Sequence, residues 1–470
     1  MRVSLLASVL LAVTASSPPA RAASPPPMRY ELTYAAAGSA TVHVRIDLPA
    51  AASPCTLMIP RAVPMGYGEE PYDRFVTNVK AFDAAGKPLQ VARAEGPRWS
   101  VGTASRVEYD VDVARMEREI TTGTDSSRVR PDYAAFLGYS VFGLIEGKED
   151  LPIVLHVVAP KGWPVFSTLA PAGGEMRAGN FYALADAQIV MGPAFHARQV
   201  QYAGEKRVPL HLVYYSEVPV DGARLETISG QAVAAMLDYF DVPGPAPFAH
   251  YTVFLEFLKP ASPKHEYGFG MEHMESFHAA LAAADADPAA FPDARLRYHI
   301  AHHVAHAWIP KRSYGEGYYP FTWASAPQID TIWFSEGFAQ YAAIAALATT
   351  EDQRQQMLDR RFRSVLRETT PELRHMPLRE LSLLASTQYA TDFRIGQLTF
   401  ARGGLMAAEM DDYIQSETHG QKTLRDALRF LIAWSAQNHR AFRIEDLPVR
   451  FREATGADIT PILEKWLAPL

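Results

Sequence analysis

The N-terminal part of the chain alternates apolar and polar residues with the period of a β-strand. Apolar side chains stand at every second position over residues 42–48, with polar side chains between them, which is typical of a half-buried strand. Turn signals such as Ala85-Gly86-Lys87-Pro88 separate this run from several similar ones. The other strand-like runs lie at residues 76–81, 99–101, 107–113 and 153–158. The pattern predicts an antiparallel β domain, either a sandwich or an open barrel, over residues 28–215.

The spacing of apolar residues changes to a helical period after Gly222. Residues 223–240 predict a helix that ends before Pro243-Gly244-Pro245, and residues 250–258 predict a strand. A glycine-rich turn at residues 267–273 then leads into a short extended segment.

Helices dominate the rest of the chain. A histidine-rich helix is predicted over residues 294–308, with Asp293 as its N-cap. An alanine-rich helix that ends near Thr349 follows Glu336. Further helices are expected at residues 397–414, 423–434 and 459–466. The chain is therefore predicted to be an α+β multidomain protein, with a central domain over residues 216–350 and a helical domain over residues 351–470.

The N-terminus has the three parts of a signal peptide. Arg2 supplies the positive charge, residues 5–13 form a short apolar core, and Ala20-Arg21-Ala22 forms an A-x-A cleavage site. We therefore expect residues 1–22 to be removed on export to the periplasm or the medium. An apolar run of about ten residues is too short to span a bilayer, and no membrane association is expected after cleavage.

Composition excludes several other classes of protein. Apolar residues make up 48% and charged residues 21% of the chain, as in a globular protein rather than a disordered one. The net charge of −7 is small for 470 residues and the basic residues are scattered, so nothing indicates a nucleic-acid partner. Cys55 is the single cysteine, which excludes an internal disulfide. We expect it to be a small buried apolar residue rather than a reactive thiol.

Residues 297–308 hold four of the fifteen histidines. Because a helix turns by about 100° per residue, His299, His302, His303 and His306 would share one arc about 100° wide. His302 and His306 have the i, i+4 spacing of two zinc ligands on a helix. In the zincin pattern H-E-x-x-H a glutamate follows the first histidine and acts as general base. His303 stands at that position in this chain.

A catalytic zinc ion needs three protein ligands and one open position. The third ligand should be a carboxylate from another element, and Glu336 at the start of the next long helix is the natural candidate. Alone, an H-x-x-x-H pair is common by chance, and a glutamate at a helix start often serves the helix dipole. Together with Glu272 in the glycine-rich segment, these residues form a more specific pattern.

Three segments of this pattern resemble the glycyl-aminopeptidase family of zinc metallopeptidases, family sixty-one of the gluzincins. That family shows G-L-E-H, H-E-x-x-H-x-W-x-x-K-R and W-x-x-E-G-F, followed by Y-x-K-G. The corresponding segments here are residues 270–273 (GMEH), 302–312 (HHVAHAWIPKR) and 333–338 (WFSEGF). The likeness extends into the β domain, at Ile59-Pro60 through Gly66-Tyr67, Phe136-Leu137-Gly138 and Gly162-Trp163.

The resemblance implies a β domain, a thermolysin-like catalytic domain and a helical C-terminal domain. It implies that His302, His306 and Glu336 bind one Zn²⁺ ion. It also implies that Glu272, with Gly270 and Met271 beside it, receives the free α-amine of a peptide substrate.

Two positions depart from the family pattern. His303 replaces the glutamate that acts as general base, and Phe400 in Phe400-Ala401-Arg402-Gly403 replaces the tyrosine that stabilises the oxyanion. Losing a general base typically costs about 10²–10⁴-fold in rate, and losing one oxyanion donor costs about 10²–10³-fold. The two losses need not multiply, because such groups act as a unit.

Several roles are open for the residues at these positions. Neutral His303 could accept a proton itself, bind the metal as a fourth ligand, or disfavour metal as a cation. His299 is expected to be a bystander. Four tyrosines could reach the oxyanion in place of Phe400: Tyr314, Tyr318, Tyr319 and Tyr389.

Three functions are compatible with the sequence. The first is an exported zinc-binding, aminopeptidase-type metallopeptidase with impaired hydrolysis of peptides that have a free N-terminus. The second is a non-catalytic pseudopeptidase that binds peptides or a protein partner. The third is a structural protein in which the metal only joins two domains. Glu272 disfavours the structural protein, since an amine-binding carboxylate has no structural purpose. His303 and Phe400 favour the pseudopeptidase over a fully active enzyme.

Overall fold

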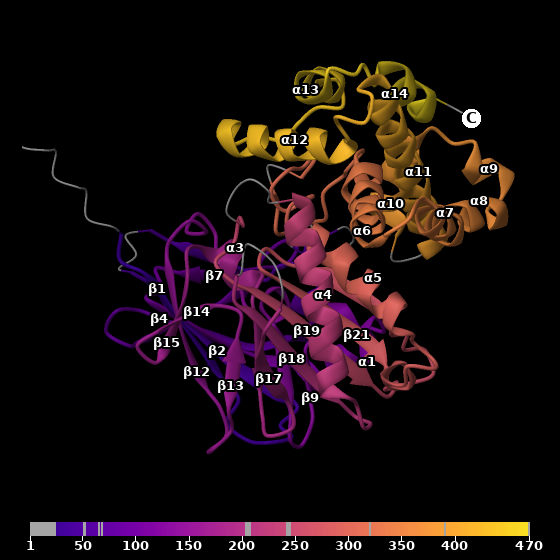
Figure 1. Cartoon of the computed structure of the whole chain (residues 1–470). Helices are drawn as coiled ribbons and strands as arrows, with labels where there is room; N and C mark the ends of the chain where they lie inside the picture. The colour runs from indigo at the N-terminus through magenta and orange to yellow at the C-terminus, as the bar shows by residue number, and fades with distance from the viewer. Residues whose placement is uncertain are drawn as a thin grey trace, which may run out of the picture.

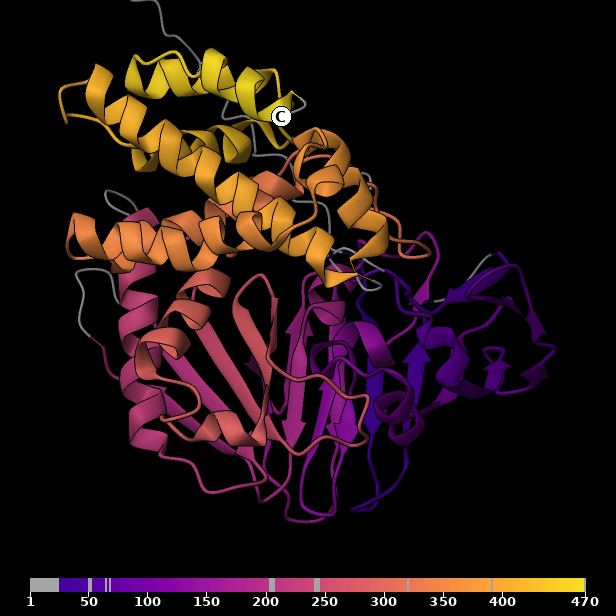
Figure 2. The same ribbon diagram turned by 90° about the vertical axis from the view of Figure 1, so that its right-hand side faces the viewer.

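The computed structural model describes residues 25–49, 53–63, 66, 69–202, 208–240, 246–318, 321–389 and 392–468. The expected signal peptide, residues 1–22, lies outside the described residues, and so does Tyr319. The strands of the N-terminal and central parts lie together, and the helices of the C-terminal part cover one end of them (Figures 1 and 2). The predicted α+β class, with a β-rich N-terminal part and a helical C-terminal part, is confirmed.

The largest sheet has eight strands in the order β14-β15-β12-β1-β2-β8-β4-β5. The predicted alternation is present in β2, where Val42, Val44 and Ile46 are buried. Most neighbouring strands are antiparallel, as predicted, but β1 and β12 run parallel, so the sheet is mixed. The strands are β1 (Met28–Thr33), β2 (Thr41–Asp47), β4 (Val76–Phe82), β5 (Pro88–Leu89), β8 (Arg106–Asp112), β12 (Ile153–Val158), β14 (Ala170–Ala172) and β15 (Glu175–Ala178).

Two four-stranded sheets complete the N-terminal part, in the orders β13-β16-β10-β9 and β11-β3-β7-β6. Their apolar side chains join those of the large sheet in one core, in which Cys55 is buried as expected. The strands are β3 (Cys55–Met58), β6 (Ala92–Arg93), β7 (Arg98–Gly102), β9 (Arg128–Val129), β10 (Ala134–Leu137), β11 (Leu144–Ile145), β13 (Val165–Ser167) and β16 (Gln188–Met191). Short helices lie between them, namely α1 (Val113–Glu119), α2 (Gly138–Val141) and α3 (Phe181–Ala185).

A five-stranded sheet in the order β17-β18-β19-β21-β20 carries the central part. Its three inner strands are parallel and the two edge strands are antiparallel to their neighbours. Every residue of β19 is buried, as expected for a strand that is covered on both faces. The strands are β17 (His196–Val200), β18 (Leu210–Ser216), β19 (Tyr251–Leu258), β20 (Phe269–Glu272) and β21 (Ser276–Ala282). Because β17 already belongs to this sheet, we propose that the domain border lies between β16 and β17 rather than at residue 216.

Helices α4 (Gly222–Phe240) and α5 (Asp293–Ala305) pack against each other and against this sheet. The histidine-rich helix α5 ends at Ala305, three residues earlier than predicted. The prediction of Asp293 as its N-cap is wrong, because Asp293 is the first helical residue and Pro292 precedes it. The Asp293 carboxylate instead accepts a hydrogen bond of 2.7 Å from Arg224 Nε on α4.

The C-terminal part is helical, as predicted. A π-helix at Trp333–Phe338 runs directly into α6 (Ala339–Leu347). The longest helix, α11 (Phe393–Glu417), crosses this π-helix. The other helices are α7 (Glu351–Leu358), α8 (Ser364–Glu368), α9 (Pro371–Arg374), α10 (Leu378–Gln388), α12 (Leu424–Asn438), α13 (Asp446–Thr455) and α14 (Thr460–Leu467). No helix among the described residues is long and apolar enough to cross a lipid bilayer.

A buried ionic cluster joins the N-terminal and central parts. Arg128 in β9 contacts Glu256 in β19 at 2.8 Å, and both side chains are fully buried. Tyr133 donates a hydrogen bond of 2.7 Å to the same carboxylate, and His278 Nε2 lies 2.6 Å from it. Burial opposes ionisation of Glu256, but Arg128 and His278 hold the pKa of Glu256 below its usual value. The carboxylate is therefore charged at the domain interface, where it contacts Tyr133, His278 and Arg128.

Replacing Arg128 by methionine should lower the free energy of unfolding by about 3–5 kcal/mol, because Glu256 would keep a buried charge without its partner. Urea denaturation followed by circular dichroism measures this change. R29A is the matched control, since the Arg29–Glu175 pair is exposed and should contribute about 0–1 kcal/mol. A loss in R128M no larger than in R29A would contradict the role of the buried pair.

Candidate active site

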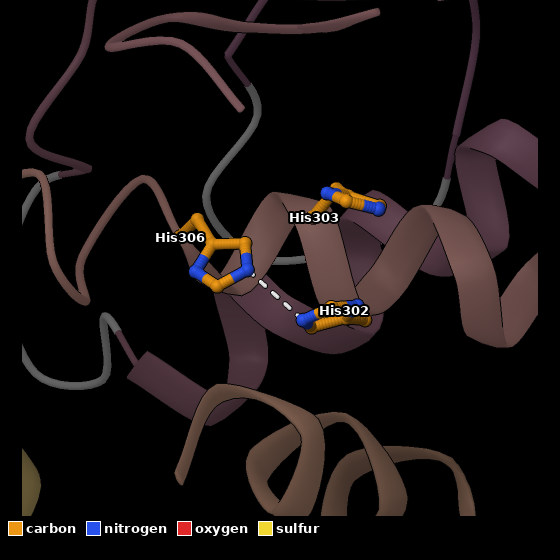
Figure 3. Close-up of side chains that lie close together, drawn as sticks. All are labelled: His302, His303 and His306. Atoms are coloured by element: carbon orange, nitrogen blue, oxygen red, sulfur yellow. Dashed lines mark hydrogen bonds between the residues drawn. The ribbon is translucent and has the colours of Figure 1, made fainter. Parts of the chain in front are cut away.

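Helix α5 presents three buried histidines near its C-terminal end. Leu296, Ile300 and Val304 are buried in the core, and this leaves the histidines on the adjoining arc of the helix. His302 and His306 lie one turn apart, and their Nε2 atoms are 2.9 Å from each other. Figure 3 shows these two rings facing each other, whereas His303 lies to one side.

A backbone carbonyl fixes the orientation of the His306 ring. The Nδ1 atom of His306 lies 2.8 Å from the carbonyl oxygen of Ile309, in the turn that follows α5. A carbonyl oxygen can only accept, so Nδ1 carries a proton and Nε2 is turned toward His302. Metal-binding histidines in other proteins are oriented in the same way.

Glu336 completes a triangle with these two nitrogen atoms. Its Oε2 atom lies 3.2 Å from His302 Nε2 and 3.6 Å from His306 Nε2. Tetrahedral zinc with bonds of about 2.0–2.1 Å would hold its ligand atoms about 3.3–3.4 Å apart. The three separations, 2.9, 3.2 and 3.6 Å, bracket this value, so the donor set fits a zinc ion.

Glycine residues allow the segment that carries Glu336 to approach α11 closely. A Cβ atom on Gly337 would lie 2.5 Å from backbone atoms of Gly403 and Gly404, and one on Gly403 would lie 2.0 Å from the Trp333 carbonyl oxygen. Only glycine fits such a backbone-to-backbone contact. The π-helix, a geometry frequent at functional sites, therefore rests directly on α11, and this contact sets the position of Glu336.

Strand β20 delivers Glu272 from the opposite side. Gly270 and Glu272 pair with Ala279 and Phe277 of β21, and the contact of Phe277 with His303 shows that this face is turned toward α5. Strand alternation turns Met271 to the other face, where it packs against the N-terminal core. The structure thus brings Glu272 to the histidines and keeps Met271 away from them.

His303 is held as a buried ring between α5 and β20. It stacks on Phe277 with ring centroids 4.5 Å apart and an angle of 9°. Its Nδ1 atom lies 3.9 Å from Glu272 Oε2, and a Cβ atom on Gly270 would lie 2.5 Å from its Nε2 atom. Gly270 is therefore needed to make room for this ring. His299 contacts the edge of the same ring, at a centroid distance of 4.9 Å.

Among the described residues, two overlapping groups of side chains could hold a metal ion. Within each group the possible ligand atoms all lie within 4.8 Å of one another. One group consists of His302, His303 and His306, and the other of Glu272, His306 and Glu336. His306 belongs to both groups and is the centre of the cluster. No residue of this cluster is exposed.

Burial and mutual contact shift the pKa values of these groups strongly. Burial opposes ionisation of Glu272, but His306 and His303 lower its pKa to about 2. The pKa of Glu336 also lies well below its usual value, because His306 and His302 outweigh its burial. Burial opposes protonation of His306, but Glu336 and Glu272 raise its pKa to about 9, whereas burial and His303 lower that of His302 to about 3. The buried carboxylates of Glu272 and Glu336 thus stabilise the positive charge of protonated His306 between them. The same negative charge would stabilise a bound metal cation.

Two half-buried carboxylates of the N-terminal part, Asp125 and Glu70, were not predicted. Asp125 ends a short helix at Gly123–Asp125 that packs against β20 and β21. Burial and the charge of Glu272 raise its pKa. Burial and Asp125 raise the pKa of Glu70 to about 7. No sequence spacing relates these residues to the histidines, because only the docking of the two parts brings them together.

The position at which the family pattern has a tyrosine, and this chain a phenylalanine, lies on α11. Phe400 is buried there, and Tyr389 packs against it with ring centroids 6.0 Å apart. Tyr318 is buried and donates a hydrogen bond of 2.8 Å to Ser335. Tyr314 packs against the Tyr318 ring, and burial alone raises its pKa.

Two parts of the chain match models of the M61 peptidase family. Residues 29–193 match the Peptidase M61 N-terminal domain, and residues 295–400 match M61 glycyl aminopeptidase. The second match contains His302, His306 and Glu336 and ends at Phe400. These matches confirm the resemblance predicted from the motifs.

The fold is similar to those of solved aminopeptidases. A crystal structure of an aminopeptidase N family protein from Idiomarina loihiensis aligns with a TM-score of 0.80 and 19% identity, over 94% of this chain and 76% of that one. An M1 zinc metallopeptidase from Deinococcus radiodurans, a mutant bound to a Tyr-Ser-Ala substrate, aligns with a TM-score of 0.56 and 15% identity, over 94% and 93%. At these identities the likeness concerns the fold alone. No curated protein matches the sequence.

Replacing Gly337 by alanine should destabilise the protein by about 1–3 kcal/mol, because the added methyl group meets the backbone of α11 and one helix must shift. The displacement of Glu336 should also reduce metal binding. Thermal unfolding and metal analysis of the same samples test both effects. Gly179 is exposed with no atom near its Cβ position, so G179A should leave both quantities unchanged. Normal stability and metal content in G337A would show that the contact does not position Glu336.

Proposed function

Because the chain belongs to the M61 glycyl aminopeptidase family, whose two matched segments together cover more than half of its residues, we propose a function within that family. The protein binds one zinc ion and the free N-terminus of a peptide, and hydrolyses the peptide bond poorly. Its export to the periplasm or the medium is proposed from the N-terminal signal pattern.

The convergence of His302, His306 and Glu336 is the observation that carries this proposal. Two imidazole nitrogens and one carboxylate oxygen are a donor set that zinc prefers, and the set leaves a position open for substrate. The bond from His306 Nδ1 to Ile309 turns the other nitrogen toward the site in advance of binding. A zinc ion bound there would act as a Lewis acid toward the carbonyl group of the scissile bond.

Glu272 supplies the recognition of a free N-terminus. Its carboxylate is buried and ionised, since its pKa is lowered to about 2, and it lies beside the proposed zinc ligands. A peptide ammonium group would form a charge-assisted hydrogen bond with it. This contact would hold the first peptide bond, rather than an internal one, near the zinc position.

His303 accounts for the weak hydrolysis. Burial lowers its pKa, so the ring is neutral at pH 7 and is able to accept a proton. However, the ring stacks on Phe277, and its nitrogen atoms face Glu272 and Gly270. A general base must reach the attacking water within hydrogen-bond distance. The stacked ring has little freedom to turn toward such a water molecule.

The same packing of His303 favours one alternative, a pseudopeptidase that binds peptides or a protein partner without cleaving them. In that case the ring serves as a wall of the site, and zinc with Glu272 provides binding only. Hydrolysis that is absent while peptide binding is retained would support this alternative.

We expect about one equivalent of zinc in the purified protein. Replacing a ligand, as in H302A or E336A, should reduce the zinc content to a small fraction, because two ligands alone hold the ion weakly. H299A is the matched control on the same helix and should retain the metal. Less than about a tenth of an equivalent in the wild-type protein, measured by mass spectrometry, would refute zinc binding.

The wild-type protein should cleave glycine or alanine p-nitroanilide slowly or not at all. H303E should raise kcat/KM by about 10²–10⁴-fold, because it restores a carboxylate base at that position. H303Q is the control, since it has a similar size but cannot act as a base. Turnover in the wild type comparable to that of ordinary aminopeptidases, abolished in H303A, would instead identify His303 as a working base.

A further inference from the structure

Helix α11 carries Phe400 at the position where the family pattern has a tyrosine that donates a hydrogen bond to the oxyanion. Phe400 lies one turn before Gly403, which touches the Trp333 carbonyl at the start of the segment that bears Glu336. The ring is buried, with 8% of its surface exposed. Since phenylalanine has no polar atom on its ring, Phe400 cannot itself stabilise a negatively charged oxygen.

The ring of Tyr389 is locked against the same face of α11. Tyr389 follows α10, and its backbone N–H bonds to the Ala385 carbonyl at 3.0 Å. Its ring contacts those of Phe393 and Phe400, with centroids 5.3 and 6.0 Å away. These two residues, the first and the eighth of α11, hold the ring along the helix.

An interior glycine of α11 makes room for this tyrosine. A Cβ atom on Gly396 would lie 2.5 Å from Cδ2 and 2.6 Å from Cε2 of Tyr389. Glycine inside a helix costs about 1 kcal/mol relative to alanine. The helix tolerates this cost at a position where any side chain would overlap the Tyr389 ring, so the ring is placed by the fold and does not merely rest on the surface.

A ring contact through Phe393 links Tyr389 to the strand that carries Glu272. Phe393 also packs against Phe269, at 5.3 Å, at the start of the strand that carries Glu272. Burial raises the pKa of Tyr389 well above its usual value, and the carboxylates of Glu336, Asp125 and Glu272 raise it further. The hydroxyl therefore keeps its proton at neutral pH.

The other described tyrosines proposed for this role are less suitable. Tyr318 donates its hydroxyl hydrogen to Ser335 and Tyr314 packs against the Tyr318 ring, whereas Tyr389 packs against Phe400 itself.

We propose that the Tyr389 hydroxyl supplies the hydrogen bond that Phe400 cannot, by donating to the carbonyl oxygen that becomes negative when the peptide bond is attacked. This inference rests on the proposed function, because it concerns the same site and the same substrate class. No bond to hydrogen breaks in this step, and the proton stays on the phenol. The weak hydrolysis would then result from the replacement of the general base and not from the replacement at position 400.

The test compares two ligands on the zinc-loaded wild-type and Y389F proteins. The phosphinic analogue of Gly-Ala has a tetrahedral, negatively charged group in place of the peptide bond, whereas glycinamide has only the amine. Calorimetry should show that Y389F binds the phosphinic analogue about 10²-fold more weakly and binds glycinamide as the wild type does. Zinc content and melting temperature of Y389F should stay close to those of the wild type. Y314F should bind both ligands normally.

The outcomes separate this inference from the proposed function. If the wild type binds the phosphinic analogue and Y389F binds it equally well, or if Y389F loses both ligands alike, the role of Tyr389 is refuted while the proposed function stands. If the zinc-loaded wild type fails to bind the analogue, the proposed function is refuted and the inference with it. In the activity assay, H303E/F400Y should be no more active than H303E; a further gain of about a hundredfold would show that position 400 still lacked its donor.

Discussion

The arrangement of the site depends on a contact between two helices that touch through their backbones. Glu336 faces His302 and His306 because the π-helix lies directly on α11, and glycines 337 and 403 are what permit this distance. The histidines are positioned independently, by the packing of α5 on the sheet. In a metal centre made in this way, the central part supplies the two histidines, and the C-terminal helices fix the position of Glu336. The helical part is therefore a component of the site and not only its cover.

Charge balance explains why a site with altered chemistry can persist. Glu272 and Glu336 are buried, and isolated buried carboxylates are very costly. The protonated imidazole of His306 compensates one of the two charges, and a divalent cation would compensate both. Neither His303 nor Phe400 adds a charge at neutral pH, so their presence leaves this balance intact. Metal binding and amine binding can thus be retained where proton transfer is impaired.

Much of the fold and of the candidate site could be predicted from the sequence, for identifiable reasons. The i, i+4 spacing of His302 and His306 and the W-x-x-E-G-F segment are local patterns, and the structure brings their side chains together. The N-cap assignment of Asp293 was wrong, because its carboxylate interacts with Arg224 on a distant helix. Asp125 was missed because only tertiary packing brings it to β20 and β21. The Ile309 carbonyl was missed because its bond to His306 depends on the conformation of the turn that follows α5. The domain boundaries and the ligand roles remain predictions.

The Arg128–Glu256 contact also has a consequence for how the protein folds. Its partners are 128 positions apart along the chain, so the N-terminal part is synthesised with an arginine whose counter-ion arrives much later. Contacts of such long range slow folding, and an N-terminal part whose buried Arg128 lacks its contact with Glu256 is incomplete on its own. The two parts should therefore reach the native state together, as one cooperative unit. The N-terminal part would therefore be needed even in a protein that had lost its catalytic residues. Its Arg128 neutralises the buried charge of Glu256 in the central sheet.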